Sequence, residues 1–155
     1  MNVPLMPILF QAPPGTTNLS CGSVNLWALR EGEYLLAEAK NEVHKDRGEI
    51  NKDETGQMNN ATGWFKNHYP GAKVHNFIII PTAKVGAGAV FNEEVGVMRI
   101  KDLSNLKENV RRFFGELEQL DFRTITEERV QQKIDAHSLS TTDLVEKYHK
   151  KPQMF

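Results

Sequence analysis

A carboxylate and an amine end an apolar stretch of this chain, at Glu38-Ala39-Lys40. The residues before them, 34–37, are mostly apolar and predict the second strand of a β-hairpin. Successive side chains of a strand point to opposite faces, so Glu38 and Lys40 are expected on the same side of the sheet. Two interpretations are open. The pair is either an exposed strand-end ion pair, worth ~0–1 kcal/mol, or a metal-binding carboxylate beside a fixed cation, which suits phosphodiester chemistry.

The elements that would position this pair follow from the pattern of apolar residues. Residues 24–29 predict the first strand of the hairpin, with the polar residues 30–33 between the strands. A helix is expected over residues 55–68, with capping residues at 51–54 and a stop at Tyr69-Pro70-Gly71. The β-branched run of residues 77–80 predicts a buried strand that ends at Pro81, and residues 95–100 predict another strand.

The last part of the chain is predicted to be helical. Asp102 or Ser104 is expected to cap a helix with one apolar stripe, and Thr126 and Ser140 are expected to cap two more. We expect three regions: an extended arm rich in proline and glycine over residues 1–22, an α/β core over residues 23–120, and C-terminal helices packed on or beside that core over residues 121–155.

Composition limits the class of protein. A chain of 155 residues has the size of one ordinary domain, and 39% hydrophobic and 25% charged residues are typical of a soluble globular protein. No run is long and apolar enough to span a bilayer, and the first ten residues lack the basic region of a signal peptide. A single cysteine, Cys21, cannot form an internal disulfide, so we expect a reducing compartment, the cytoplasm. The net charge of −1 neither predicts nor excludes DNA binding.

The order of these elements carries a resemblance to a known family. A hairpin that ends in Glu38-Ala39-Lys40, a helix that begins near Glu54-Thr55-Gly56-Gln57 and the strand 77–80 with Pro81 resemble the PD-(D/E)XK nuclease superfamily. The resemblance covers residues 24–100. It implies an α/β fold of the restriction-endonuclease-like type, in which helices flank a mixed β-sheet, followed here by a helical C-terminal part.

The resemblance also implies roles for individual residues. Glu38 would be the acidic metal ligand, the carbonyl of Ala39 would contribute a metal contact, and Lys40 would lie beside the attacking water and the phosphate. Gln57 matches a position where several branches of the family place a glutamine facing the active site. The expected metal is Mg²⁺, for which Mn²⁺ can substitute; it binds oxygen ligands and activates water. Basic residues near this region are expected to contact DNA: Lys45, Arg47 and Lys52.

The chain departs from the family at the start of the first hairpin strand. The family has an aspartate there, a little over ten residues before the glutamate, and Asn25 is the residue expected at that place. Asparagine can coordinate a metal through its oxygen but brings no negative charge. We therefore expect Asn25 and Glu38 to face one cleft, a weakened Mg²⁺ site, poor cleavage of DNA, and a gain in both on Asn25→Asp. Two alternatives stay open: Asn25 is an engineered inactivating change, or another acid, at Asp46, Glu49, Asp53 or Glu54, completes the site.

Three hypotheses about function remain at this point. The first is a Mg²⁺-dependent DNA endonuclease domain of a restriction or DNA-processing system, in which a metal-activated water hydrolyses the phosphodiester. The second is a catalytically silent DNA-binding or assembly module of the same fold, and the third is an interaction domain in which Glu38 and Lys40 only pair. A homodimer and further domains are compatible with each, and no membrane partner is expected. The histidines at 44, 68 and 75 have no zinc-ligand spacing with Cys21 and are expected at the surface or at a helix end.

Overall fold

The computed structural model describes residues 24–40 and 44–154, except for the side chain of Val24. Its centre is a four-stranded sheet in the order β1-β2-β3-β4, with β1 at Val24–Arg30, β2 at Glu33–Ala39, β3 at Lys73–Ile79 and β4 at Val95–Met98. β1 is antiparallel to β2, whereas β2, β3 and β4 are parallel to one another. The predicted mixed sheet flanked by helices is confirmed, and the expected N-terminal arm lies outside the described residues.

The β1–β2 hairpin contains an irregularity that decides which residues face each other. Arg30 pairs with Glu33 next to a tight turn in which Gly32 has a φ of 70°, a value that favours glycine. The register then shifts by one residue between Ala28 and Arg30, as at a β-bulge. Beyond this shift the register pairs Val24 with Glu38 and Asn25 with Ala37.

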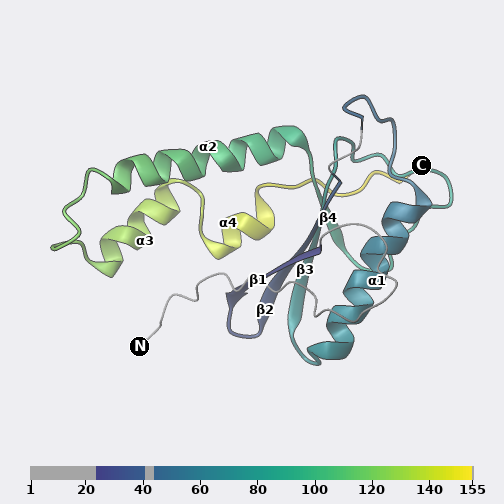
Figure 1. Cartoon of the computed structure of the whole chain (residues 1–155), viewed down its shortest axis with the longest axis horizontal. Coiled ribbons are helices and arrows are strands. Elements are labelled where there is room, and N and C mark those ends of the chain that lie inside the picture. The colour runs from purple at the N-terminus through teal and green to yellow at the C-terminus, as the bar shows by residue number, and fades with distance from the viewer. Residues whose placement is uncertain (1–23, 41–43, 155) are drawn as a thin grey trace.

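Helix α1, Lys52–His68, connects β2 to the parallel strand β3 and covers one face of the sheet (Figure 1). Asn51 caps it in a reciprocal arrangement, in which the Asn51 side chain accepts from the Glu54 amide and Glu54 accepts from the Asn51 amide. The core between helix and sheet is fully buried and apolar, and its largest members come from both elements: Leu36, Met58, Phe65 and Ile78. The sheet face that carries Leu36 is therefore the α1 face.

Several predicted boundaries differ from the structure: α1 begins at Lys52 and not at residue 55, and β4 ends at Met98 and not at residue 100. Strand β3 begins at Lys73, four residues before the predicted strand, because its first residues continue the parallel ladder alongside β2, from the pair Lys73 and Glu33 onward. Helix α2, Ile100–Leu117, begins before the predicted caps: Arg99 is the N-cap residue, and Asp102 lies in the first turn and accepts from the Arg99 amide. Thr126 and Ser140 cap α3 and α4 as predicted.

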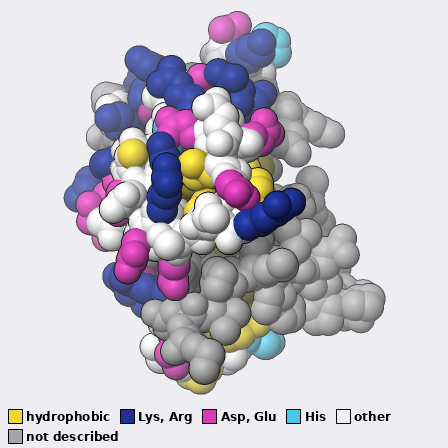
Figure 2. All heavy atoms as spheres, turned by 90° about the vertical axis from the view of Figure 1, so that its left-hand side faces the viewer, with side chains coloured by type: hydrophobic (Ala, Val, Ile, Leu, Met, Phe, Trp, Pro, Cys, Tyr) yellow, Lys and Arg dark blue, Asp and Glu magenta, His cyan; other side chains and the backbone are white. Residues whose placement is uncertain are grey.

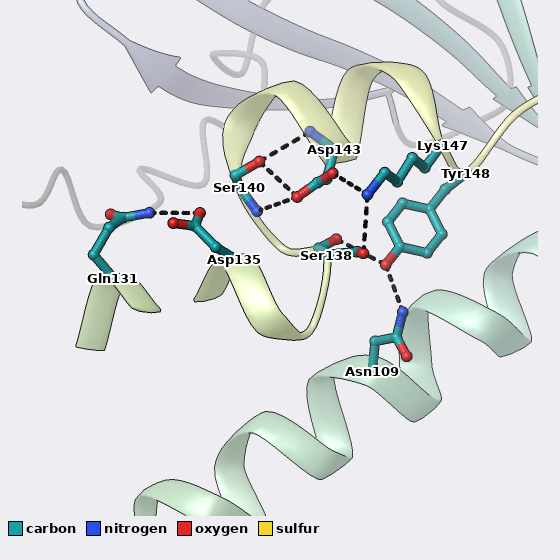
Figure 3. A network of polar contacts seen from close by, with 8 residues as sticks. All are labelled: Asn109, Gln131, Asp135, Ser138, Ser140, Asp143, Lys147 and Tyr148. Atoms are coloured by element: carbon teal, nitrogen blue, oxygen red, sulfur yellow. Dashed lines mark hydrogen bonds and ion pairs between the residues drawn. The ribbon is translucent and has the colours of Figure 1, made fainter. Parts of the chain in front are cut away.

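The C-terminal helices α2, α3 (Glu127–Ala136) and α4 (Thr141–Glu146) lie together on the other side of the sheet from α1 (Figure 1). A polar network links them (Figure 3): the Tyr148 hydroxyl donates to the Ser138 carbonyl (2.8 Å) and accepts from Asn109 of α2 (2.7 Å).

At this end of the molecule Figure 2 shows positive and negative side chains interspersed around a small exposed apolar area. Of the helices described, none has the length and apolar character that crossing a membrane requires.

Candidate functional site

Three side chains that are far apart in the sequence meet where β2 ends. The Lys40 Nζ donates both to Glu38 Oε1 and to Gln57 Oε1, so a single ammonium group joins the last residues of β2 to the second turn of α1. The Glu38 side chain is only 1% exposed and that of Lys40 is 12% exposed. The prediction that Gln57 points from an early turn of the helix toward this site is confirmed. The pair is buried, so the interpretation as an exposed ion pair is wrong.

The local fold explains why these three residues meet. The amide of Lys40 donates to the Ile79 carbonyl (3.1 Å), which extends the β2–β3 ladder past the end of the strand. Glu38 alternates with Leu36 along β2 and therefore lies on the face that α1 covers. Gln57 precedes the buried Met58 on the helix, and packing of Met58 in the core fixes the rotation of this turn.

The charge of Glu38 is incompletely compensated. Its Oε1 is paired with Lys40, but its Oε2 is buried and accepts no hydrogen bond from the described residues. A buried carboxylate oxygen without a partner is costly, since its desolvation is not repaid. It is the only carboxylate oxygen among the described side chains in this condition, and a further hydrogen-bond donor would offset the cost.

Asn25 does not belong to this group, and the prediction that it faces Glu38 is wrong. The register pairs Asn25 with Ala37, and directly opposite residues of an antiparallel pair share a face. Asn25 is thus on the face opposite to Glu38. The cause is the shift between Ala28 and Arg30: the uninterrupted register of the Arg30–Glu33 pair would have set Asn25 opposite Glu38.

The donor set does not fit a divalent metal. Mg²⁺ requires several oxygen ligands and a net negative environment, whereas the cluster offers one carboxylate that Lys40 already neutralises. Among the described residues no group of three or more histidine, cysteine, aspartate or glutamate side chains is arranged to hold a metal ion. Residues 1–23 contain no acidic side chain, and Glu42 lies outside the described residues. These residues therefore provide no basis for a metal-dependent hydrolysis step.

The acids proposed as substitutes are engaged elsewhere or exposed. Glu54 is buried at the start of α1, where Oε1 lies 2.7 Å from Arg47 Nη1 and Oε2 accepts from the Asn51 amide. Asp46, Glu49 and Asp53 are exposed. Arg47 also donates to the Glu49 carbonyl (3.0 Å), so this guanidinium fastens the loop to the helix. It is not freely presented to DNA, unlike the exposed side chains of Lys45 and Lys52.

A second charged cluster, which the sequence did not predict, lies at the other end of β2. Glu33 is buried and contacts Arg30, Lys73 (3.1 Å) and His75 (2.6 Å). Hydrogen bonds from Arg30, and after it from His75, lower the pKa of Glu33 to about 2. These residues line a cavity of about 280 Å³ between the sheet and α4. His75 is therefore a half-buried partner of a buried carboxylate, whereas His44 and His68 are exposed as expected.

Only the spacing of Arg30 and Glu33 at the hairpin turn could have suggested this second cluster. Its remaining members come from β3, more than 30 residues later in the chain, so they depend on the parallel pairing of β2 with β3. The same pairing sets Glu33 opposite Lys73 in the ladder and so places the two charges side by side.

A serine and a lysine also meet in the C-terminal helices, at Ser138 and Lys147 (3.1 Å) (Figure 3). Ser138 has a φ of 55°, an unusual value for a residue other than glycine. A serine nucleophile would need an unprotonated lysine as its base. Here Asp143 lies 2.6 Å from the lysine and raises the pKa of Lys147, so the contact is structural.

Comparison with known proteins identifies no relative of this chain. No protein-family model matches it, and neither a curated protein nor a solved structure is significantly similar.

Proposed function

We propose that this chain is a nucleic-acid-binding domain with the phosphodiester site of the PD-(D/E)XK type, in which the metal-binding half of the site is incomplete. The observation that supports this most is the contact of one lysine ammonium with Glu38 and Gln57. An ion pair that serves packing alone requires no glutamine from a facing helix. A glutamate and a lysine two residues apart on a strand, with a glutamine from the next helix, form the arrangement that the family resemblance implies.

Each residue has a definite task in this proposal. Lys40 supplies a fixed positive charge just after the end of β2, and this charge would stabilise a phosphate oxygen. Gln57 holds the ammonium through its carbonyl oxygen, which leaves its amide nitrogen free to act as a donor toward the same phosphate. Glu38 keeps the lysine charged and in place. Lys45, which lies in the loop between β2 and α1, and Lys52, the first residue of α1, would contact the neighbouring phosphates.

DNA binding tests the proposal directly. Fluorescence anisotropy with a short labelled duplex, at low salt and with EDTA present, is expected to show binding that weakens as salt is added. The double variant Lys45→Glu/Lys52→Glu should weaken binding at least tenfold. Lys66→Glu is the matched control, since this exposed lysine lies in the last turn of α1, at the far end of the helix from Gln57, and should change binding little. Absence of binding, or equal loss in the control, would contradict the proposal.

Cleavage decides between the two functions that this site could serve. An active endonuclease would nick a plasmid with Mg²⁺ or Mn²⁺ and would lose that activity on Glu38→Gln. A silent DNA-binding module would bind the duplex and leave it intact. We expect the second outcome for this sequence, because a single neutralised carboxylate does not form a hard-cation site. Strong nicking that depends on Glu38 would show that the chain is an active nuclease.

A further inference from the structure

One side of helix α2 exposes large apolar side chains. Leu103 is 40% exposed and Phe114 is 56% exposed, and Phe122, in the turn that follows the helix, is 69% exposed. The helices α3 and α4 lie along another side of α2 (Figure 1), where the ring of Phe113 meets that of His137. Single exposed apolar residues are common on protein surfaces, but several on one helix and the turn after it indicate an interaction surface.

Exposed charged residues lie on the same side of α2. An α-helix has 3.6 residues per turn, so positions three or four apart are neighbours on one side. Lys107 and Arg111 follow Leu103 at intervals of four, and Glu118 follows Phe114 at the same interval. Neither Lys107 nor Glu118 has an ion-pair partner among the residues that the structure describes. We call this surface the exposed side of α2; in chain order it consists of Leu103, Lys107, Arg111, Phe114, Glu118 and Phe122.

The exposed side of α2 is complementary to itself when a second copy runs in the opposite direction. A two-fold axis that crosses α2 at right angles between residues 112 and 113 sets positions at equal distances from it opposite each other. Lys107 then lies opposite Glu118 of the second copy, so each side chain gains a counter-charge. Leu103 lies opposite the turn that carries Phe122 of the second copy, so two exposed apolar groups cover each other.

The same arrangement sets Arg111 opposite Phe114 of the second copy, near the axis. Glu108 holds the Arg111 guanidinium through two hydrogen bonds of 2.9 Å, and such bonds lie in the plane of the group. The flat face of the guanidinium therefore stays available to an aromatic ring, on which arginine packs favourably. A parallel arrangement would instead set Lys107 against Lys107 and Glu118 against Glu118, and like charges repel. The charges therefore favour the antiparallel direction.

We propose that two copies of this chain associate through the exposed side of α2, with their α2 helices antiparallel. The observation that carries the proposal is the self-complementary order of charged and apolar groups on a surface that stays exposed in the single chain. This surface is separate from the cluster of Glu38, so the inference does not depend on the nucleic-acid function. One helix from each copy gives a small interface, so we expect weak association in which monomer and dimer coexist.

Sedimentation velocity of the full chain tests the proposal. Protein concentrations of about 10–300 µM cover the range in which a small interface forms. The unmodified chain is expected to shift from monomer toward dimer as its concentration rises. Phe114→Ala removes a ring at the centre of the interface and should raise the Kd of the dimer by about tenfold or more. Because this ring is exposed in the single chain, the Tm of the monomer should stay unchanged.

Charge reversal tests the direction of the two helices. Lys107→Glu and Glu118→Lys each set like charges opposite one another, so each should raise the Kd by about tenfold or more. An equimolar mixture of these two variants brings opposite charges together again, so it should associate nearly as tightly as the unmodified chain. Lys101→Glu is the matched control, since this exposed lysine lies on a different side of α2 and its reversal changes the net charge as much as Lys107→Glu does.

Three results would overturn the proposal. The first is a chain that stays monomeric over the whole range; a Tm that then falls on Phe114→Ala would show that a segment of the same chain, such as residues 1–23, covers this surface. The second is a dimer that Phe114→Ala and the charge reversals leave unchanged, or that Lys101→Glu weakens equally, because the copies would then meet through another surface. The third is a mixture of Lys107→Glu and Glu118→Lys that associates no better than either variant alone, which would exclude the antiparallel pairing.

Discussion

Val24, and not Asn25, is the residue of β1 that the hairpin register pairs with Glu38. The two candidates are neighbours in the sequence, but alternate strand residues project from opposite faces, so only one of them can share the face of Glu38. The one-residue shift between Ala28 and Arg30 makes the choice. A small irregularity next to the turn thus determines which residue of β1 lies opposite Glu38 at the other end of the hairpin.

The buried pair of Glu38 and Lys40 makes a strong prediction about stability. Lys40→Met should lower the free energy of unfolding by about 3–5 kcal/mol, because it leaves a buried carboxylate without its counter-charge. The double variant Glu38→Leu/Lys40→Met removes both charges and should lose much less. Urea unfolding at pH 7 measures both changes, with Lys66→Met as the control, since the pair of Lys66 with Glu93 is exposed and should contribute about 0–1 kcal/mol. Equal effects of Lys40→Met and Lys66→Met would contradict the prediction.

Glu33 should make the stability of the protein depend on acid pH. Arg30, and after it His75, lower the pKa of Glu33 from 4.5 to about 2 in the folded protein. A carboxyl group with a lowered pKa binds its proton more readily in the unfolded chain, so its stabilising contribution is fully present above pH 4.5 and is lost as the pH falls toward about 2.

The measurement compares the unmodified chain with Glu33→Gln by urea unfolding between pH 7 and pH 2. The variant should be less stable at pH 7, and the difference between the two proteins should shrink below pH 4.5. Other acids contribute equally to both proteins, since Glu108, for example, is unchanged in the variant. A difference that stays constant over this range would show that Glu33 has the same proton affinity in the folded and unfolded chains.

Gly96 of β4 should tolerate no side chain, because Phe77 of β3 and His149 of the segment after α4 both pack against it. A Cβ atom at this position would overlap the ring of Phe77 and would lie 2.7 Å from Cδ2 of His149, which packs edge-on against the same ring. Gly96→Ala should therefore lower the free energy of unfolding by about 1–3 kcal/mol. Gly63→Ala is the matched control: this glycine is exposed on α1 with no atom within 4 Å of the added carbon, and the change should stabilise the helix by about 0.5–1 kcal/mol.

Recovery of stability by a second substitution checks the cause. Phe77→Leu in the Gly96→Ala background removes part of the ring that the new methyl group would meet, so the double variant should be more stable than the two separate losses predict. Strict additivity of the two losses in chemical unfolding would show that the methyl group at position 96 and the ring of Phe77 do not compete for the same space.

The sequence by itself determined the local relationships. Glu38 and Lys40 share a face because strand side chains alternate, and Asn51 with Glu54 marks the start of α1 because both groups satisfy amides of the first helical turn. Gln57 could be assigned to the sheet-facing side from its spacing to the apolar residues of the helix. These relationships depend on residues a few positions apart, whose geometry the backbone conformation fixes.

Only the tertiary structure decided the relationships between strands. The hairpin turn alone would set Asn25 opposite Glu38, and the bulge moves Val24 there, because a shift of one residue exchanges the two faces of a strand. The pairing of Glu33 with His75 joins residues 42 positions apart and exists because β2 and β3 are parallel neighbours. Burial of the Glu38–Lys40 pair likewise required α1 to pack over the end of β2, since a charge pair at a strand end is exposed unless another element covers it.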